Sequence, residues 1–129
     1  MNNKYESFAH IVLNHFLRNT ATASPVTVYV ALFNTTPTKT TPGTEVSGTA
    51  YARVPVTFGA PSGGVVTNSS PVSFPTAGAG GWGTVNGCGI FDQASGGQLY
   101  YFGDLTASKT VDAGDTVTFA TGALSVTET

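Results

Sequence analysis

The stretch "WGTVNGCGIFDQASGGQLYYFGDL", residues 82–105, decides the predicted fold. Its first half, 82–92, is an apolar run interrupted by glycines, which indicates a strand with a bulge or a close backbone contact. A turn signal, QASGG, follows at 93–97, and 98–105 is a second apolar run rich in aromatic residues. The pattern predicts an antiparallel hairpin. Cys88 lies in the first strand, where we expect a small buried apolar side chain rather than a nucleophile.

The same strand-like pattern continues outward from this hairpin. VTVYVALF, residues 26–33, is apolar on both faces and predicts a central strand. Residues 51–58 alternate, and Pro55 places that strand at an edge or a bulge. Shorter runs predict strands at 65–68, 71–75, 116–120 and 123–127, and the last two are expected to pair with each other. About eight strands at this spacing predict a mainly β fold, an antiparallel β-sandwich or jelly roll.

One α-helix is predicted, at the N-terminus, over residues 3–18. Asn3 is the expected N-cap, and Glu6 stands three residues later as in a capping box. Apolar residues recur at three-to-four-residue spacing, and Leu13 and Leu17 widen the apolar face. So wide a face needs cover on more than one side, and we expect the helix to pack either on the chain's own sheet or into a neighbouring subunit. We therefore divide the chain into a docking helix, 1–20, and a β-sandwich domain, 21–129. The helix residues expected at a protein interface are Tyr5, Phe8, Val12 and Phe16.

The composition favours a protein that meets other proteins. At 129 residues the chain fits one domain with its own core. Only 9% of its residues are charged and its formal net charge is −2, so few charges need to be desolvated on assembly. We expect neither nucleic acid nor membrane as a partner. A single cysteine allows no intrachain disulfide, and the N-terminus does not resemble a signal peptide, so we expect folding in a reducing cytoplasm.

Several residue patterns could suggest chemistry, but each has a simpler interpretation. His10 and His15 are five residues apart, about 140° around a helix, and cannot chelate one metal together. GAGGWG, 78–83, matches a nucleotide-binding pattern but precedes a predicted strand instead of a helix. We therefore predict no enzyme activity, no metal and no cofactor.

Four aspartates stand near predicted turns: Asp92, Asp104, Asp112 and Asp115. Aspartate favours turns because its carboxylate accepts hydrogen bonds from nearby backbone N–H groups. A calcium site made of loop oxygens, or a glycosidase-like pair of Asp92 and Asp104, remains the functional alternative.

Four aromatic residues raise the alternative of a sugar-stacking platform: Tyr51, Trp82, Tyr100 and Tyr101. Tyr100 and Tyr101 are adjacent in a predicted strand and point to opposite faces, so they cannot both belong to one platform. Packing in the core or at an interface is the commoner role for such residues.

The segment TEVSGTAYARVPVTFG, 44–59, holds two of the chain's few charges, Glu45 and Arg53. A turn at Gly48 would fold Glu45 back onto Arg53 and pin the start of an edge strand. Alternation places Arg53 and Tyr51 on a face that meets solvent or another subunit. We expect a structural clasp here, with a subunit contact through Glu45, Tyr51 and Arg53 as the functional alternative.

Several segments together carry a resemblance to a known group of proteins. They are VTVYVALFNTTPT (26–38), TEVSGTAYARVPVTFG (44–59), 82–105, and VDAGDTVTFATGALSVT (111–127). In this order they resemble small virion proteins of tailed bacteriophages, usually described as tail-fibre-like or minor tail proteins. The resemblance covers roughly 26–127. It implies a multicopy structural role in the virion, without catalysis, after folding in the host cytoplasm.

The expected function is that of a capsid decoration (cement) protein that binds and stabilises the capsid lattice. A fibre needs a shaft, and one sandwich of this length has none. The alternative is a minor tail or tail-fibre-like protein, and a further alternative is a carbohydrate-binding module. The expected partners are other virion proteins, either the major capsid protein or tail proteins. We also expect a homo-oligomer, and a trimer would suit a local threefold axis.

Overall fold

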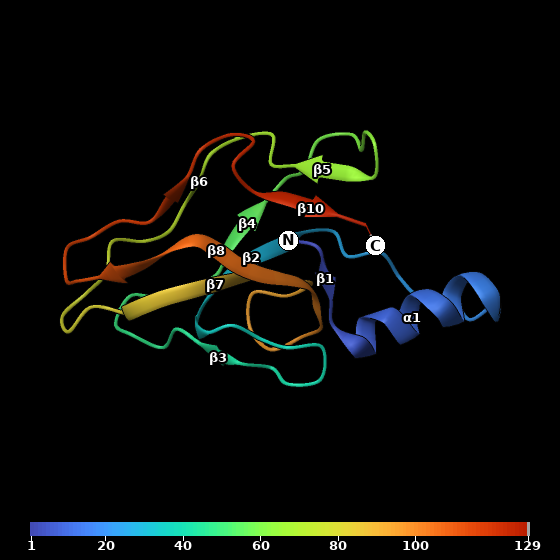
Figure 1. Ribbon diagram of the computed structural model, residues 1–129, viewed down its shortest axis with the longest axis horizontal. Helices are drawn as coiled ribbons and strands as arrows, with labels where there is room; N and C mark the ends of the chain where they lie inside the picture. Colours follow the sequence, from blue (N-terminus) through green and yellow to red (C-terminus); the bar gives the residue numbers. More distant parts are fainter. Residues whose placement is uncertain (129) are drawn as a thin grey trace.

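The computed structural model describes residues 1–128, and over these residues the chain forms ten strands in antiparallel sheets and one N-terminal helix (Figure 1). The predicted mainly β, sandwich-like fold is confirmed. All eight predicted strands are present, and two strands of two residues each, β1 and β3, add to them. The elements are β1 (Asn3–Lys4), α1 (Glu6–Leu17), β2 (Val28–Thr35), β3 (Thr44–Glu45), β4 (Val54–Val56), β5 (Val65–Thr67), β6 (Val72–Ser73), β7 (Gly83–Phe91), β8 (Leu99–Val111), β9 (Thr118–Phe119) and β10 (Ser125–Thr127).

The main sheet is built around the predicted hairpin of β7 and β8. Its strand order is β1-β8-β7-β2-β3, and β4 also pairs with β2, so β2 is central as predicted. The short strand β4 pairs with β2 alone, which confirms the edge position indicated by Pro55. The register between β7 and β8 shifts between Val85 and Gly87, and the extra residues there, 105–108, lie in β8 and not in the glycine-interrupted strand. β8 is longer than predicted: it continues past residue 105 to Val111, pairing with the start of β7.

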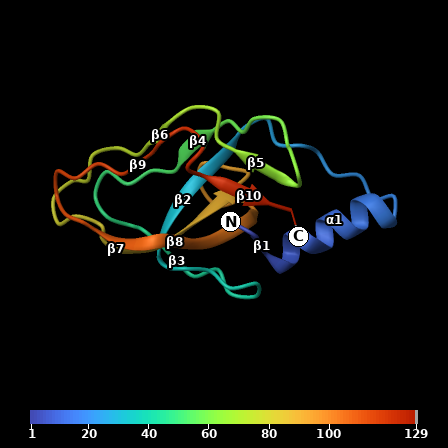
Figure 2. The same cartoon turned by 45° about the horizontal axis from the view of Figure 1, so that its top comes forward.

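Two small sheets, β5–β10 and β6–β9, form the second layer of the sandwich (Figure 2). The prediction that the last two strands pair with each other is therefore wrong. Asn68 supplies the physical reason: its side chain, in a residue only 1% exposed, donates to the Ala120 carbonyl and accepts from the Leu124 N–H. This buried amide fixes the turn at 120–124 from outside, and β9 and β10 pair with different strands, β6 and β5.

The main core lies between these two layers. Val30 pairs with Ile90 and Leu32 pairs with Cys88, so these side chains share the inner face of the main sheet. The buried residues of this core are Val30, Leu32, Val46, Val56, Val72, Phe74, Ala77, Trp82, Val85, Cys88, Ile90, Val111, Val117, Leu124 and Val126.

The outer face of the main sheet carries a second set of buried apolar side chains. Phe33 is 1% exposed and stacks on Phe91 with ring centroids 6.2 Å apart. Glycines make room for this cover: a Cβ at Gly89 would stand 3.0 Å from the Phe33 ring, and one at Gly87 would stand 2.3 Å from the Thr36 hydroxyl. The glycine interruptions of β7 at Gly87 and Gly89 thus reflect close packing on the outer face of the sheet.

The chain enters the sheet before it enters the helix. Asn3 pairs with Phe102 in β8, and the Tyr5 N–H donates to the Tyr100 carbonyl at 3.0 Å. The prediction that Asn3 caps a helix starting at residue 3 is therefore wrong, because strand pairing occupies that segment. The helix begins at Glu6, and no side chain caps it. Figures 1 and 2 both show α1 projecting away from the two layers.

The division of the chain into residues 1–20 and 21–129 stays an interpretation, and its last residue, 129, lies outside the described residues. Among the described residues no helix is long and apolar enough to span a membrane.

Candidate functional site

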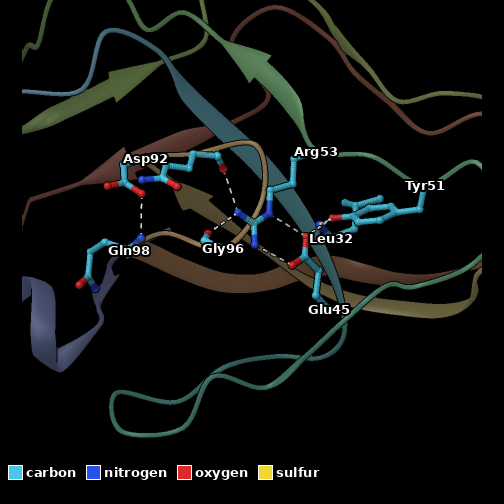
Figure 3. A network of polar contacts seen from close by, with 8 residues as sticks. Leu32, Glu45, Tyr51, Arg53, Asp92, Gly96 and Gln98 are labelled. Carbon is cyan, nitrogen blue, oxygen red and sulfur yellow. Dashed lines mark hydrogen bonds and ion pairs between the residues drawn. The ribbon is translucent and has the colours of Figure 1, made fainter.

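The predicted pair of Glu45 and Arg53 is formed, and it is bidentate (Figure 3). Arg53 Nε donates to Glu45 Oε2 at 2.9 Å, and Nη2 donates to Oε1 at 2.8 Å. Glu45 ends β3, and Arg53 directly precedes β4. A turn between them, in which the Tyr51 N–H donates to the Gly48 carbonyl at 3.2 Å, returns the chain as predicted. Parallel N–H···O bonds of this kind fix both side chains in one geometry.

The remaining donors of Arg53 reach across to the β7–β8 hairpin. Nη1 donates to the carbonyls of Gln93 and Gly96 at 2.8 and 2.7 Å. The guanidinium carbon lies 3.6 Å from the ring centroid of Phe91, which adds a cation–π contact. The Arg53 side chain is consequently only 7% exposed. Of the two surroundings predicted for it, solvent or another subunit, solvent covers little of the side chain, and the subunit contact stays a prediction. The hairpin covers the guanidinium, and alternation along the strand gave no sign of that cover.

Tyr51 links the ion pair to the centre of the sheet. Its hydroxyl donates to Glu45 Oε2 at 2.6 Å and accepts from the Leu32 N–H at 3.0 Å. Leu32 lies on β2 between the residues that pair with β4 and those that pair with β3, so the hydroxyl fills a gap in the ladder. Burial of the phenol, and then its hydrogen bond to Glu45, raise the pKa of Tyr51 far above its ordinary value. The group therefore stays a neutral donor.

We call Glu45, Tyr51 and Arg53, with their contacts, the clasp. A cavity of about 380 Å³ lies beside it, lined in part by Ala94, Ser95 and Gly96. The polar atoms of the clasp already form hydrogen bonds within the chain, so few of them could bind a ligand in this cavity. Over residues 1–128, every buried side-chain nitrogen or oxygen has a hydrogen-bond partner. The geometry is that of a structural corner; the role of these three residues in a subunit contact stays a prediction.

The aspartates lie where turn chemistry predicts them, with one exception. Asp92 accepts from the Gln98 N–H at 2.7 Å and closes the β7–β8 turn, and Asp115 accepts from the Asp112 N–H at 2.9 Å. Asp104 does not end its strand: it pairs with Gly87 inside β8 and accepts from the Thr36 hydroxyl at 2.6 Å. Asp92 therefore stabilises the β7–β8 turn, whereas Asp104 binds Thr36, the residue directly after β2.

The candidate nucleophile and metal ligands are not brought together. Cys88 is buried, and desolvation raises the pKa of its thiol to about 11, which keeps it neutral and unreactive. His10 and His15 are exposed on α1. No group of three or more metal-ligating side chains is found among the described residues.

The aromatic residues considered as a sugar platform are distributed differently. Trp82 is 4% exposed, and its indole N–H donates to the Thr49 carbonyl at 3.0 Å, so it belongs to the core. Tyr51 packs edge-on against Trp82 inside the clasp. Tyr100 and Tyr101 both contact Phe8 of α1, at centroid distances of 4.3 and 5.4 Å. Trp82 and Tyr51 are therefore unavailable for stacking on a sugar.

The helix divides into a half that the sheet covers and a half that it does not. Tyr5, Phe8 and Val12 are partly buried, and the contacts of Phe8 with β8 anchor the helix base. No residue of α1 is fully buried. The side chains beyond the base project from the body, and we call these three the exposed apolar surface: Leu13 is 51% exposed, Phe16 74% and Leu17 76%.

The predicted interface residues thus fall into different environments. Phe16 is exposed, as an interface residue of a free subunit should be. Tyr5, Phe8 and Val12 are partly buried within the chain, so they also contribute to the fold. Sequence reasoning missed Val26, predicted within the central strand, which is fully exposed in the segment returning from α1. It also missed Phe91, Gln93 and Gly96 around Arg53, because no local pattern links residues so far apart along the chain.

Comparison with known proteins gives one family. A family model described as "Podophage GP4 fiber I protein gp80" matches residues 4–127, nearly the whole chain. No curated protein matches the chain.

Proposed function

Because the chain belongs to the podophage GP4 fiber I protein gp80 family, and is thus a phage virion structural protein of the fibre type, we propose that it is a non-catalytic unit of the tail fibre. In this proposal α1 is the docking element that attaches the sandwich to a neighbouring virion protein. The family match over residues 4–127 carries the proposal. The family description names a fibre protein, so it favours the tail and fibre reading over capsid decoration.

The arrangement of side chains supports a structural rather than a catalytic role. Chemically capable groups are engaged in holding the fold: Arg53 in the clasp, Asp92 and Asp115 in turns, and Cys88 as a neutral buried thiol. In contrast, three of the four large apolar side chains exposed among the described residues lie together on α1, namely Leu13, Phe16 and Leu17. Apolar surface concentrated in this way is typical of a protein–protein contact.

A second candidate, capsid decoration, draws on the same observation. A compact sandwich with a projecting apolar helix could clamp neighbouring capsomers, and the partner would then be the major capsid protein. The carbohydrate-binding alternative has less support, because Trp82 and Tyr51 lie in the core and the clasp. In all these readings Cys88 remains a reduced thiol, which suits folding in the host cytoplasm.

Labelling the protein on intact virions tests the proposal. Antibody-bound gold particles, or a small tag placed at the exposed Ala79, would be located by electron microscopy. We expect label on the tail or its fibres. Label spread over the head would overturn the tail-fibre proposal in favour of capsid decoration.

A further inference from the structure

The N-terminal segment of the chain joins the two layers of the sandwich. In the main sheet, β1 pairs with β8 at Tyr101 and Phe102. Met1 reaches β10 in the second layer, where its carbonyl accepts from the Thr127 N–H at 2.8 Å and its ammonium donates to the Ser125 carbonyl. Both views of the molecule place the N-terminus beside β10 (Figures 1 and 2). A short extended segment thus forms backbone hydrogen bonds with a strand of each layer.

A cavity of about 470 Å³ lies next to Met1, and we call it the interlayer groove. One length of β8 borders it together with two lengths of the second layer: 104–107 with Lys109, then 117–119 and 123–125. Leu105, Phe119 and Leu124 give it apolar walls. Its volume falls within the range of about 300–1,000 Å³ that is usual for binding sites.

The wall that β8 contributes is a strand with an unpaired edge. The pairing of β1 with β8 stops at Phe102, and no other described strand pairs with that edge of β8. On the β7 side, residues 105–108 stand opposite Asn86 alone, so most of them lack a strand partner there as well. Across the groove, β9 pairs with β6 alone. Unpaired backbone N–H and C=O groups of this kind are a template for a further strand.

The charged groups that the groove offers are cations. Lys109 pairs with Val85, whose side chain lies in the main core, so both side chains are on the inner face of the sheet. Lys109 is exposed and belongs to neither of the two ion pairs of the described chain. Asp104 also borders the groove, but its carboxylate accepts from the Thr36 hydroxyl on the outer face. Lys109 and the Met1 ammonium therefore favour an anionic group in the groove.

We propose that the interlayer groove binds an extended acidic segment of a neighbouring virion protein, which adds a strand to the free edge of β8. Residues 1–4 of the chain already show this mode of binding, since they lie as an extended segment between the same two layers. Backbone hydrogen bonds to β8 supply affinity, and every second side chain of the partner meets the walls at Leu105, Phe119 and Leu124. A carboxylate of the partner beside Lys109 fixes the register.

This partner site is separate from the docking surface proposed on α1. No residue of that helix lines the groove, so the inference goes beyond the proposed docking role and does not depend on it. It requires a virion structural protein, which the family match gives, and it holds for a tail or a head position. An extended peptide fits better than a small apolar anion, because the β8 wall offers unpaired backbone groups along a strand as well as apolar side chains.

Selection from a display library of random peptides tests the proposal on the purified chain. Peptides of about nine residues are long enough to span the groove as a strand. The enriched peptides should alternate apolar with polar residues and carry at least one aspartate or glutamate. Ala123→Trp fills the groove, which Ala123 lines, and should abolish their binding. A selection that yields only basic peptides, or none whose binding depends on an open groove, would overturn the proposal.

Matched substitutions separate the groove from the rest of the surface. Ala79→Trp adds the same indole at an exposed position outside the groove and should leave binding unchanged. Lys109→Glu should weaken binding of an enriched acidic peptide by about fivefold. Lys39→Glu makes the same charge change at an exposed lysine outside the groove and should have little effect. Equal weakening by the two lysine substitutions would contradict the proposed contact with Lys109.

Hydrogen exchange of the unmodified chain distinguishes strand addition from simple filling of an apolar cavity. A bound peptide should slow exchange of the backbone amides of 104–109, because new ladder hydrogen bonds protect them. Decanoate, an apolar anion without backbone groups, is the comparison probe and should give those amides no protection. If the peptide protects them no better than decanoate does, the groove is a small-molecule site and the proposal is wrong. These outcomes are independent of where gold label lies on virions.

Discussion

The clasp and the exposed apolar surface of α1 reverse the usual placement of residue types. Arg53, a charged residue, has a side chain only 7% exposed, whereas Phe16, an aromatic one, is 74% exposed. Charged residues are rarely buried unless they are paired, and large apolar residues are rarely left open without a reason. The two regions break the usual rule in opposite directions.

The difference lies in where each region finds its partners. The clasp finds them within the chain, because Glu45, Gln93 and Gly96 supply oxygens for Arg53. The exposed apolar surface does not, because no element among residues 1–128 covers Leu13, Phe16 and Leu17. The clasp should therefore matter for folding, and the exposed surface for assembly.

The largest expected effect comes from breaking the clasp. Arg53→Ala should lower the free energy of unfolding by about 3–5 kcal/mol, because removing one member of a buried pair strands the other and its hydrogen-bond partners. Urea denaturation followed by circular dichroism would measure it. Arg18→Ala, at an exposed arginine on the other region, is the control and should change stability by less than about 0.5 kcal/mol. Equal losses of unfolding free energy in the two variants would contradict the view that the clasp, and not the helix end, stabilises the fold.

A smaller change to the clasp tests its hydrogen bond to strand β2. Tyr51→Phe keeps the ring but removes the hydroxyl that bridges the Leu32 N–H and Glu45. It should lower the free energy of unfolding by about 1–3 kcal/mol, the cost of leaving a buried backbone donor unsatisfied. The same denaturation measurement applies. A neutral result would mean that water or a shifted side chain satisfies Leu32 as well as the hydroxyl does.

Alkaline pH should weaken the clasp without any mutation. The pKa of Tyr51 is raised by burial, so the native state holds the phenolic proton more tightly than the unfolded state does. Its contribution is complete below the ordinary tyrosine pKa of about 10 and is lost as pH rises above that value, by at most about 1.4 kcal/mol per pH unit. Cys88, whose pKa is raised from 9.0 to about 11, adds a loss in the same direction from about pH 9.

Unfolding free energies measured between pH 8 and pH 11 would test this dependence. The decline should be shallower in Tyr51→Phe above pH 10 and shallower in Cys88→Ala between pH 9 and pH 11. If the slope in either variant is unchanged, deprotonation of the replaced residue does not contribute to the loss of stability at alkaline pH.

The smallest effect on folding should come from the exposed surface itself. At a concentration low enough to keep the protein monomeric, Phe16→Ala should change the free energy of unfolding by less than about 0.5 kcal/mol. Phe8→Ala makes the same chemical change at the base of the helix, where the ring packs on Tyr100, and should cost about 1 kcal/mol or more. Similar losses at both positions would mean that the helix is covered along its whole length in the monomer.

Much of the fold could be predicted because its signals are local. Alternation, turn residues and glycine spacing identified eight of the ten described strands and the β7–β8 hairpin. The pairings of β9 and β10 could not be predicted, because they depend on Asn68, more than 50 residues away from its partner Ala120. The N-cap assigned to Asn3 failed for a similar reason: pairing with β8 outweighed a local capping signal.

The sequence by itself determined that this chain is a low-charge β-sandwich with one apolar helix, and that Glu45 and Arg53 can meet. Those features follow from residue periodicity and from short separations along the chain. The tertiary structure decided that Arg53 is enclosed by the hairpin, that Phe8 is covered while Phe16 is not, and that a bulge in β8 interrupts its pairing with β7. Each of these depends on contacts between distant segments, and a local pattern carries no information about which segments those will be.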